Sequence, residues 1–265
     1  MIAARIVTGG VWAAWVLIVI LGTPVVALVY ALTAPFDRGR YHAGLTFRKL
    51  AVLATRSVPL WRFETDGLRI RDPRRPYVFV ANHESYADIF LISHLPWEMK
   101  WMSKDTIFRI PFMGWMMRMA GDIYLRRGDR TSALDAITAA RDRLGKRVSV
   151  MIFPEGTRSR GADLLPFKDG AFRLAVEAQV PVVPIAVAGT RDCMAKGSFV
   201  VRRARAVARV LEPVETAGLT LADVGALKDR VRQIIDRARR ELQRELGLAP
   251  AAADEERVAD PVAAP

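Results

Sequence analysis

The sequence places a histidine where a strand is expected to end, with an aspartate shortly after it. His83 follows the apolar run 77–81, and Asp88 comes five positions later. Open α/β sheets bind their ligands at the carboxyl ends of their strands, so this position suits chemistry. An imidazole takes up a proton near neutral pH, and a nearby carboxylate can fix its tautomer and stabilise the charged ring. His83 is therefore a candidate general base, and Asp88 its partner.

The same residues also have a purely structural explanation. Ser85 and Asp88 are three positions apart, which is close to the spacing of a capping box. On that interpretation Asp88 caps a helix and His83 is an ordinary core residue. A histidine and an aspartate at this spacing form a weak pattern on their own. Other stretches of the chain must decide between the two interpretations.

A glycine-containing loop with a cation follows a second apolar strand. The run FPEGTRS occupies residues 153–159. Gly156 lets a backbone approach a ligand closely, and the planar guanidinium of Arg158 suits a phosphate. Lys168 supplies another cation just before a predicted helix. The loop can hold a phosphomonoester, although a single loop of this kind is also typical of a solvated turn.

A third stretch ends a strand in two cations, Arg126 and Arg127. Side chains alternate along a strand, so only one of the two can point into a shared site. The segment 112–119 before it is rich in methionine and also contains Trp115. Methionine fills irregular apolar space. The segment could line an acyl-chain channel or dock on a membrane, and core packing is the default.

Strand and helix patterns alternate through the middle of the chain. Short β-branched runs separated by helical patterns predict an α/β fold with a mostly parallel central sheet covered by helices on both faces. The strands are expected at 77–81, 98–102, 122–126, 148–153, 182–187 and 206–211, and the helices at 85–93, 107–119, 132–144 and 170–178.

Composition narrows the class of protein. The chain has 265 residues, 51% of them hydrophobic, which is enough for one sizeable core. Its formal net charge of +12 implies an anionic partner: nucleic acid, an acidic membrane surface or a phosphorylated substrate. Cys193 is the only cysteine, which excludes an internal disulfide framework and a cysteine-based zinc site and favours the cytoplasm. The cations are scattered rather than interleaved with aromatic residues, which argues against nucleic acid.

The N-terminal part is strongly apolar, with no charged side chain from residue 6 to residue 36. A helix of that length runs roughly 45 Å, against roughly 30 Å for the hydrocarbon core of a bilayer. Gly22, Thr23 and Pro24 are expected to interrupt the run. The segment is therefore predicted to be a membrane anchor, either a single tilted or kinked span or a helical hairpin in one leaflet. A cleaved signal peptide is a third possibility, which the length disfavours.

The cations around this anchor predict its orientation. Only Arg5 precedes the apolar run, whereas five cations follow it, which predicts a catalytic domain on the cytoplasmic side of the inner or plasma membrane. The five are also expected to meet anionic lipid headgroups. They are Arg38, Arg40, Arg48, Lys49 and Arg56. The aromatic residues that could sit at interfacial depth are Trp12, Trp15, Tyr30 and Trp61.

The C-terminal part contains one further element. Thr220 can cap a last helix with a single apolar stripe, which ends at Gly247. The remaining residues are mainly alanine, proline and acidic residues, and are predicted to be disordered. The chain thus divides into an anchor at 1–45, a catalytic domain at 46–218, an amphipathic helix at 219–248 and a disordered tail at 249–265.

Four stretches, taken in order, resemble a known family. They are the Asn-His-x4-Asp block at 82–88, the GDIYLRR block at 121–127, the FPEGTRS block at 153–159 and the Val-Pro-Val-Val-Pro block at 180–184. The chain resembles the lysophosphatidate acyltransferases, or 1-acyl-glycerol-3-phosphate acyltransferases, over about residues 77–190. The third block matches the family at every position. Four ordered blocks are far more specific than any one of them.

The resemblance implies a fold and a set of site residues. The fold is expected to be like that of the glycerolipid acyltransferases, with His83 as general base and Asp88 as its orienting partner. The residues expected to bind the phosphate and glycerol of the acyl acceptor are Arg127, Glu155, Gly156, Thr157, Arg158 and Lys168. Arg126 stands where the family often has an aspartate, which puts a local ion pair, and with it the choice of acceptor, in question.

The reaction expected is acyl transfer from a thioester, either acyl-CoA or an acyl carrier protein, to the free hydroxyl of 1-acyl-glycerol-3-phosphate. The product is phosphatidate, and neither a cofactor nor a metal is expected. The expected partners are a phospholipid membrane, a lysophospholipid acceptor and the acyl donor, without nucleic acid. One alternative keeps the reaction and changes the acceptor to a lyso-aminolipid, another lysophospholipid or glycerol phosphate. The other is a non-catalytic basic protein that binds a membrane surface or nucleic acid.

Overall fold

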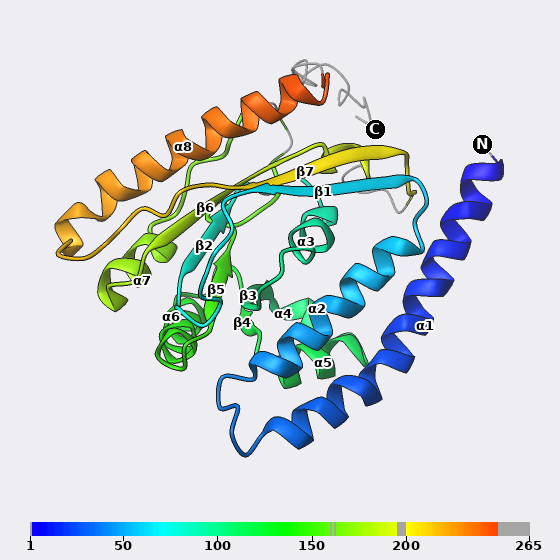
Figure 1. Ribbon diagram of the computed structural model, residues 1–265, viewed down its shortest axis with the longest axis horizontal. Coiled ribbons are helices and arrows are strands. Elements are labelled where there is room, and N and C mark those ends of the chain that lie inside the picture. The colour runs from blue at the N-terminus through cyan, green and yellow to red at the C-terminus, as the bar shows by residue number, and fades with distance from the viewer. Residues whose placement is uncertain (1, 160, 162, 195–199, 249–265) are drawn as a thin grey trace, which may run out of the picture.

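The computed structural model describes residues 2–159, 161, 163–194 and 200–248, and these build a seven-stranded sheet (Figure 1). The strand order is β1-β7-β6-β2-β5-β3-β4. The strands are β1 (Trp61–Gly67), β2 (Val78–Ala81), β3 (Met99–Lys104), β4 (Ile123–Leu125), β5 (Ser149–Ile152), β6 (Val182–Ala188) and β7 (Ala204–Val210).

The sheet is mostly parallel, as predicted. Strands β6, β2, β5, β3 and β4 run in one direction, and only the β6–β7 pairing is antiparallel. β1 pairs with β7 in parallel at the sheet edge. The sequence did not reveal β1, because its run WRFETDG has an exposed face and carries charges. The six predicted strands are confirmed with shifted ends.

Helices cover both faces of the sheet (Figure 1). α6, α7 and α8 pack on one face, and α3 with the N-terminal helices and α5 on the other. The helices are α1 (Ile2–Thr33), α2 (Tyr41–Arg56), α3 (Ala87–Ile92), α4 (Asp105–Phe108), α5 (Met113–Ala120), α6 (Arg130–Gly145), α7 (Gly170–Ala178) and α8 (Val224–Glu245), with 3-10 turns η1 (Thr190–Asp192) and η2 (Leu221–Asp223).

Strand β2 shows how the sequence sets this arrangement. Val78 and Val80 belong to the core under α6, α7 and α8, whereas Phe79 and Ala81 belong to the core under α3. Successive side chains on a strand point to opposite faces, so an all-apolar strand needs a cover on each face. β2 thus lies in the middle of the molecule, and its carboxyl end delivers the residues that follow it to one edge of the sheet.

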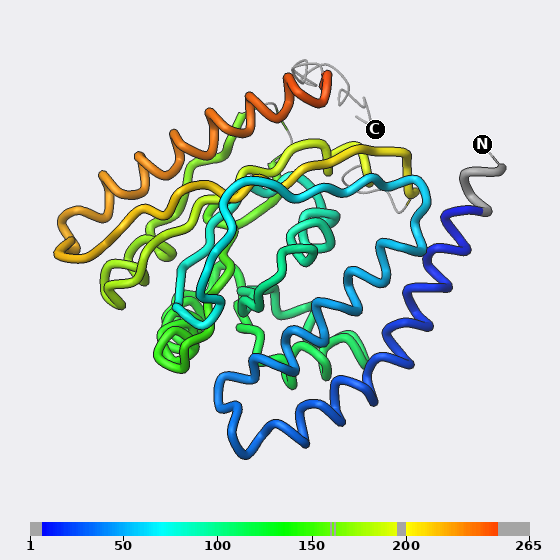
Figure 2. The backbone as a smooth tube through the Cα atoms, viewed as in Figure 1, coloured from blue at the N-terminus to red at the C-terminus, as the bar shows by residue number. Residues whose placement is uncertain are grey.

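The N-terminal apolar segment forms one helix that folds back on a second. α1 runs from Ile2 to Thr33 with Pro24 inside it, so the expected interruption at residues 22–24 does not occur. Gly22 instead lies against Leu50 of α2, where a Cβ would come within 2.4 Å of the Leu50 side chain. Figure 2 shows α1 and α2 side by side as an antiparallel hairpin. The predicted boundary after residue 45 falls inside α2.

One side of α1 remains uncovered. Residues 7–33 form the one helix, within the described part of the chain, that is long and apolar enough to cross a membrane. Its exposed large apolar residues are Val7, Val16, Leu17, Ile20, Leu21, Val25, Leu28 and Leu32. Two tryptophans expected at an interface are instead buried, because Trp15 packs on Trp61 and donates a hydrogen bond to the Ala54 carbonyl.

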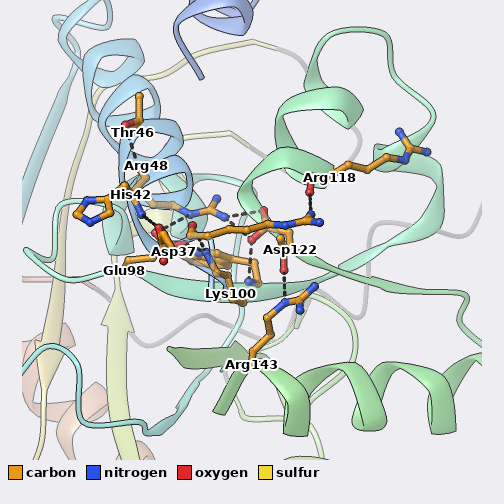
Figure 3. Close-up of polar contacts among 12 residues, drawn as sticks. Asp37, His42, Thr46, Arg48, Glu98, Lys100, Arg118, Asp122 and Arg143 are labelled. Atoms are coloured by element: carbon orange, nitrogen blue, oxygen red, sulfur yellow. Dashed lines mark hydrogen bonds and ion pairs between the residues drawn. The ribbon is translucent and has the colours of Figure 1, made fainter. Parts of the chain in front are cut away.

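A buried group of four charges holds α2 against the sheet (Figure 3). Arg48 pairs with Asp122 just before β4, and Lys100 of β3 pairs with Glu98 at 2.9 Å. Arg48 is therefore buried in the protein and does not meet lipid headgroups, which corrects the sequence prediction. Arg48 is buried rather than exposed because two carboxylates, Glu98 and Asp122, attract it. Both lie at the amino ends of strands that α2 covers. We call Arg48, Glu98, Lys100 and Asp122 the anchor-side cluster.

The single helix predicted at 107–119 is two helices. α4 ends at Phe108, and α5 begins at Met113. Pro111 and Phe112 separate the two helices, and Phe112 has a positive φ of 60°. Met116 and Met117 are buried against α1 and α2, as core packing requires, while Trp115 remains half exposed.

The last helix matches its prediction closely. Thr220 and Asp223 form a capping box, and the chain continues from η2 into α8, which ends at Glu245. The buried stripe of α8 packs on the sheet and α7. The predicted disordered tail, 249–265, lies outside the described residues.

Candidate active site

His83 and Asp88 face each other directly after β2. Nδ1 of His83 lies 2.6 Å from Oδ2 of Asp88, and the His83 side chain retains 9% of its exposure. The backbone leaves β2 at Ala81, turns through residues 82–86 and enters α3 at Ala87, so that Asp88 points back at the turn. The sequence prediction that these two side chains meet is confirmed.

Asp88 accepts several hydrogen bonds at once. Its Oδ2 accepts from the backbone N–H groups of Glu84 (2.8 Å) and Ser85 (3.0 Å), and its Oδ1 accepts from the Thr190 hydroxyl. A carboxylate surrounded by donors is an acceptor, so Nδ1 of His83 carries the hydrogen and donates it. The Nε2 lone pair of His83 is then available to take a proton. Asp88 both closes the turn and orients the imidazole.

The imidazole is fixed in its plane by a neighbouring ring. Phe153, which follows β5, stacks on His83 with centroids 4.0 Å apart and planes 15° from parallel. The preceding residue, Asn82, exchanges two hydrogen bonds with the backbone of Val187 in β6. The histidine is therefore held from both neighbouring strands. Asn82 and Phe153 were not selected as site residues, although both lie in the sequence blocks.

Glu155 connects the second loop to the histidine turn. Its Oε1 accepts from the backbone N–H of His83 at 2.7 Å, and its Oε2 accepts from that of Leu165 at 3.0 Å. Burial raises the pKa of this carboxyl, while the two N–H bonds oppose the rise. Both oxygens are used within the protein, so the described role of Glu155 is to brace the turn. Its contact with substrate stays a prediction.

The loop after β5 brings cations next to the histidine turn. The Arg158 guanidinium lies over the ring of Tyr86, 3.8 Å from its centroid, and Tyr86 belongs to the histidine turn. The Lys168 ammonium lies against Gly156, where a Cβ would come within 2.9 Å of Nζ. Gly156 has a φ of 71°, which other residues rarely adopt, so glycine serves both the turn and the close approach. Thr157 is exposed in the same loop.

The second block lies further along the same edge. Arg127 is exposed after β4, three strands away from β2, which corresponds to about 14 Å. Lys104, which no sequence pattern singled out, ends β3 between these two strands. Arg126 points elsewhere, because it bonds to the Tyr124 hydroxyl and pairs with Asp129. This pair has residue 126 as its cation, so it is not the pair that an aspartate at this position would form, and the effect of Arg126 on the choice of acceptor stays a prediction.

Three more residues that the sequence did not single out complete the site. Thr190, in η1, donates to Asp88 across 102 positions of chain. Arg191 donates to the Ser159 hydroxyl and the Gly161 carbonyl, which fixes the cationic loop. Glu84 is buried beside Asp88, and burial followed by the Asp88 charge raises its pKa to about 8. Only Glu84, as a charged neighbour of His83, could have been noticed from the sequence.

Comparisons with known proteins agree with this geometry. A sequence profile of the family described as Acyltransferase matches residues 62–188, which include His83, Asp88 and the loop at 153–159. The human 1-acyl-sn-glycerol-3-phosphate acyltransferase alpha is 36% identical over 223 residues, covering 82% of this chain and 75% of that protein. The chain belongs to the 1-acyl-sn-glycerol-3-phosphate acyltransferase family. It is an acyltransferase by this membership.

Two more relatives show how far the likeness of this acyltransferase extends. The 1-acyl-sn-glycerol-3-phosphate acyltransferase of Saccharomyces cerevisiae is 34% identical over 186 residues, which are 68% of this chain but only 60% of the yeast protein. The crystal structure of the 1-acyl-sn-glycerophosphate acyltransferase PlsC from Thermotoga maritima superposes with a TM-score of 0.76 at 26% identity. The superposition covers 91% of this chain and 97% of the Thermotoga maritima chain. The glycerolipid acyltransferase-like fold expected from the four blocks is confirmed.

Proposed function

We propose that this acyltransferase moves a fatty acyl group from a thioester to the free hydroxyl of 1-acyl-glycerol-3-phosphate, forming phosphatidate. The observation that carries the proposal is the His83–Asp88 pair, whose geometry leaves Nε2 of His83 free to accept a proton at the edge where the cationic loop lies. The named activities of the yeast, human and Thermotoga relatives support the choice of substrate.

The proposed chemistry needs one general base and no covalent acyl-enzyme. Nε2 of His83 removes the hydroxyl proton as the oxygen attacks the thioester carbonyl, and Asp88 stabilises the resulting imidazolium. The tetrahedral intermediate then collapses, the carbon–sulfur bond breaks, and the departing thiolate takes the proton from the imidazolium. Atoms and charges balance with acyl-CoA or an acyl carrier protein as donor, without a cofactor or metal.

The acceptor's phosphate is proposed to bind the cations along the carboxyl edge of the sheet. Arg158 and Lys168 lie on the loop that Glu155 ties to the His83 backbone. Arg127 follows β4, whose axis lies about 14 Å from that of β2, and it is proposed to contribute to a site that also spans the glycerol. Guanidinium groups bind phosphates through two parallel N–H donors, so they place the phosphate as well as attract it.

The exposed side of α1 is proposed to bind the phospholipid membrane from which the acceptor comes. Its uncovered apolar residues form one stripe along the helix, and Trp115 and Ile110 are exposed on neighbouring elements. Because the opposite side of α1 packs on α2 and α5, the helix lies along the catalytic domain. This arrangement favours an anchor that enters one leaflet over one that crosses the bilayer, with the catalytic domain in the cytoplasm at the inner or plasma membrane.

The decisive experiment replaces the base. His83→Ala is expected to lower kcat by about 10²- to 10⁴-fold, the usual contribution of a general base. Purified protein in detergent is assayed for transfer of an acyl group from acyl-CoA to 1-acyl-glycerol-3-phosphate, with the lipid product identified by mass spectrometry. His42→Ala is a matched control, because His42 is exposed on α2. Retained activity in His83→Ala would remove the mechanism.

The acceptor is tested separately by a panel. 1-Acyl-glycerol-3-phosphate is compared with a lyso-aminolipid, a neutral monoacylglycerol and glycerol 3-phosphate under the same conditions. Preference for the first over the lyso-aminolipid and the monoacylglycerol is expected, because the loop cations suit a phosphomonoester. Glycerol 3-phosphate shares that group and tests whether the acyl chain is required. If another acceptor is preferred and His83→Ala abolishes that activity, His83 remains the base and only the substrate changes.

A further inference from the structure

We propose that Tyr86 is a positioning residue for the acyl acceptor: its ring orients the guanidinium of Arg158 toward the acceptor's phosphate. The inference deepens the proposed function and rests on it, because Arg158 must bind that phosphate. Nothing in the four sequence blocks marks Tyr86, which occupies one of the four unspecified positions of the Asn-His-x4-Asp block.

The contact itself joins the two halves of the site. Arg158 Cζ lies 3.8 Å from the centroid of the Tyr86 ring, which is within the range of a cation–π interaction. Tyr86 comes from the turn after β2, and Arg158 comes from the loop after β5. Tyr86 is 48% exposed, so the stack lies at the protein surface. Its position is explained by the stack, since the Tyr86 side chain makes no capping bond to α3.

The backbone near Arg158 is fixed independently of this stack. The N–H of Ser159 donates to the His83 carbonyl at 2.8 Å, and Arg191 donates to the Ser159 hydroxyl at 3.2 Å. These bonds set where the Arg158 side chain begins. They do not set where its guanidinium ends, because a long flexible stem separates the two, and ordering such a stem costs conformational entropy. Tyr86 contacts the far end of that stem.

The stack has a directional consequence for phosphate binding. A ring that covers one face of a guanidinium does not compete for its planar N–H donors, and these donors make the bidentate contact with a phosphate. Pre-ordering the group also lowers the entropy lost when the acceptor binds. Tyr86 is three residues from His83, so a single turn carries both the base and the platform for the phosphate-binding group. The turn thereby sets the spacing between the reacting hydroxyl and the phosphate.

Three substitutions separate the ring from its hydroxyl and from its bulk. Tyr86→Phe keeps the aromatic face and is expected to leave the KM for 1-acyl-glycerol-3-phosphate within about twofold of that of the wild type. Tyr86→Leu and Tyr86→Ala are each expected to raise that KM about three- to tenfold with kcat nearly unchanged. Tyr86→Leu retains apolar volume. A rise in KM in both the Leu and the Ala variant therefore shows that the aromatic face, and not the bulk of the side chain, is needed. Unchanged KM in both variants would overturn the proposal.

A double-mutant cycle then tests whether Tyr86 acts through Arg158. Arg158→Ala alone is expected to raise the acceptor KM, and adding Tyr86→Ala to it is expected to cause no further rise. An equal additional rise in the double variant would contradict the positioning role. The two proposals fail in different ways. If Arg158→Ala leaves KM unchanged, the phosphate site of the proposed function is wrong, whereas a sensitive Arg158 with an insensitive Tyr86 refutes only the present inference.

Discussion

Two buried groups of charge lie at opposite edges of the sheet, and they differ in how their charges are balanced. The anchor-side cluster, Arg48, Glu98, Lys100 and Asp122, lies at the amino ends of β3 and β4. The catalytic-edge cluster, which we define as His83, Glu84, Asp88 and Glu155, lies at the carboxyl ends of β2 and β5. These four strands are parallel, so the two clusters are on opposite edges.

The anchor-side cluster balances its charges with one another. It contains two cations and two carboxylates, and Lys100 also donates to the Arg40 carbonyl. Burial raises the pKa of Glu98 and lowers that of Lys100, and the charge of each partner opposes these shifts. The result is an ion-pair network that joins α2 to the sheet and faces no substrate.

The catalytic-edge cluster has three carboxyl groups and one histidine. Backbone N–H groups and the Thr190 hydroxyl satisfy the oxygens of Asp88 and Glu155. The charges of Arg191 and Arg239 oppose the rise in the pKa of Glu84. Within the part of the chain that is described, Nε2 of His83 makes no hydrogen bond, whereas Nδ1 is committed to Asp88. The difference teaches that buried charge alone does not mark a catalytic site. What marks it is a group left with an unused, partly accessible proton acceptor.

The largest expected effect on this contrast comes from Lys100→Met. It leaves Glu98 buried beside one remaining, more distant cation, which is expected to cost about 3–5 kcal/mol of folding free energy. Unfolding in denaturant measures the loss, and kcat per folded molecule should stay near the wild-type value. The double variant Glu98→Leu/Lys100→Met is expected to recover much of the stability, because it removes both charges. A drop in kcat without lost stability would erase the distinction between the clusters.

A smaller loss of stability is expected from Gly44→Ala. A Cβ at Gly44 would come within 1.9 Å of Glu98 Oε1, so the cluster and α2 must move apart, at a cost of about 1–3 kcal/mol. The control is Gly225→Ala in α8, where nothing lies within 4 Å and alanine should stabilise the helix slightly. Thermal melts of both variants give the comparison. Equal increases in the melting temperatures of the two variants would show that α2 is not in close contact with the charges.

At the catalytic edge, Thr190→Val is expected to lower kcat about tenfold. The change removes the hydroxyl that donates to Asp88, and one hydrogen bond to a charged group contributes about 1.5–3 kcal/mol. Thr190→Ser keeps the donor and should retain most of the rate. Initial rates at saturating acceptor provide the measurement. A valine variant as fast as the wild type would mean that Asp88 does not depend on this donor.

A pH dependence of stability, rather than a fixed loss, is expected at Glu84. Its pKa rises from an ordinary value of 4.5 to about 8, so between these pH values the folded protein holds a proton that the unfolded chain has released. The contribution of this group to stability therefore falls as the pH rises from about 4.5 to 8. Glu84→Gln stays neutral, so its melting temperature relative to wild type should increase between pH 5 and pH 8. A constant difference would contradict the buried, protonated carboxyl.

Local residues were enough to predict much of the fold and the first half of the site. The apolar strand at 77–81 and the turn after it place His83 and Asp88 together because only five positions separate them. The capping interpretation of Asp88 was also correct in part, since Asp88 accepts from the Ser85 N–H. β1 was missed because its charged, exposed residues carry little hydrophobic signal.

Contacts between distant segments could not be predicted in this way. Arg48 was expected at the membrane, because no sequence pattern relates it to Asp122, 74 positions later. The same holds for Thr190 with Asp88 and for Tyr86 with Arg158. The last two pairs form only after parallel strands bring two strand ends to the same edge, and the first forms only after α2 packs on the sheet.

The sequence by itself determined which chemistry this protein can carry. It supplied an imidazole with a carboxylate one turn away, a cationic loop after another apolar strand, and an apolar segment long enough for a bilayer. Only the tertiary structure decided which charges become a structural network and which remain available for reaction. The physical reason is that a charge's role depends on the donors, acceptors and solvent around it. Strand order and helix packing determine those surroundings.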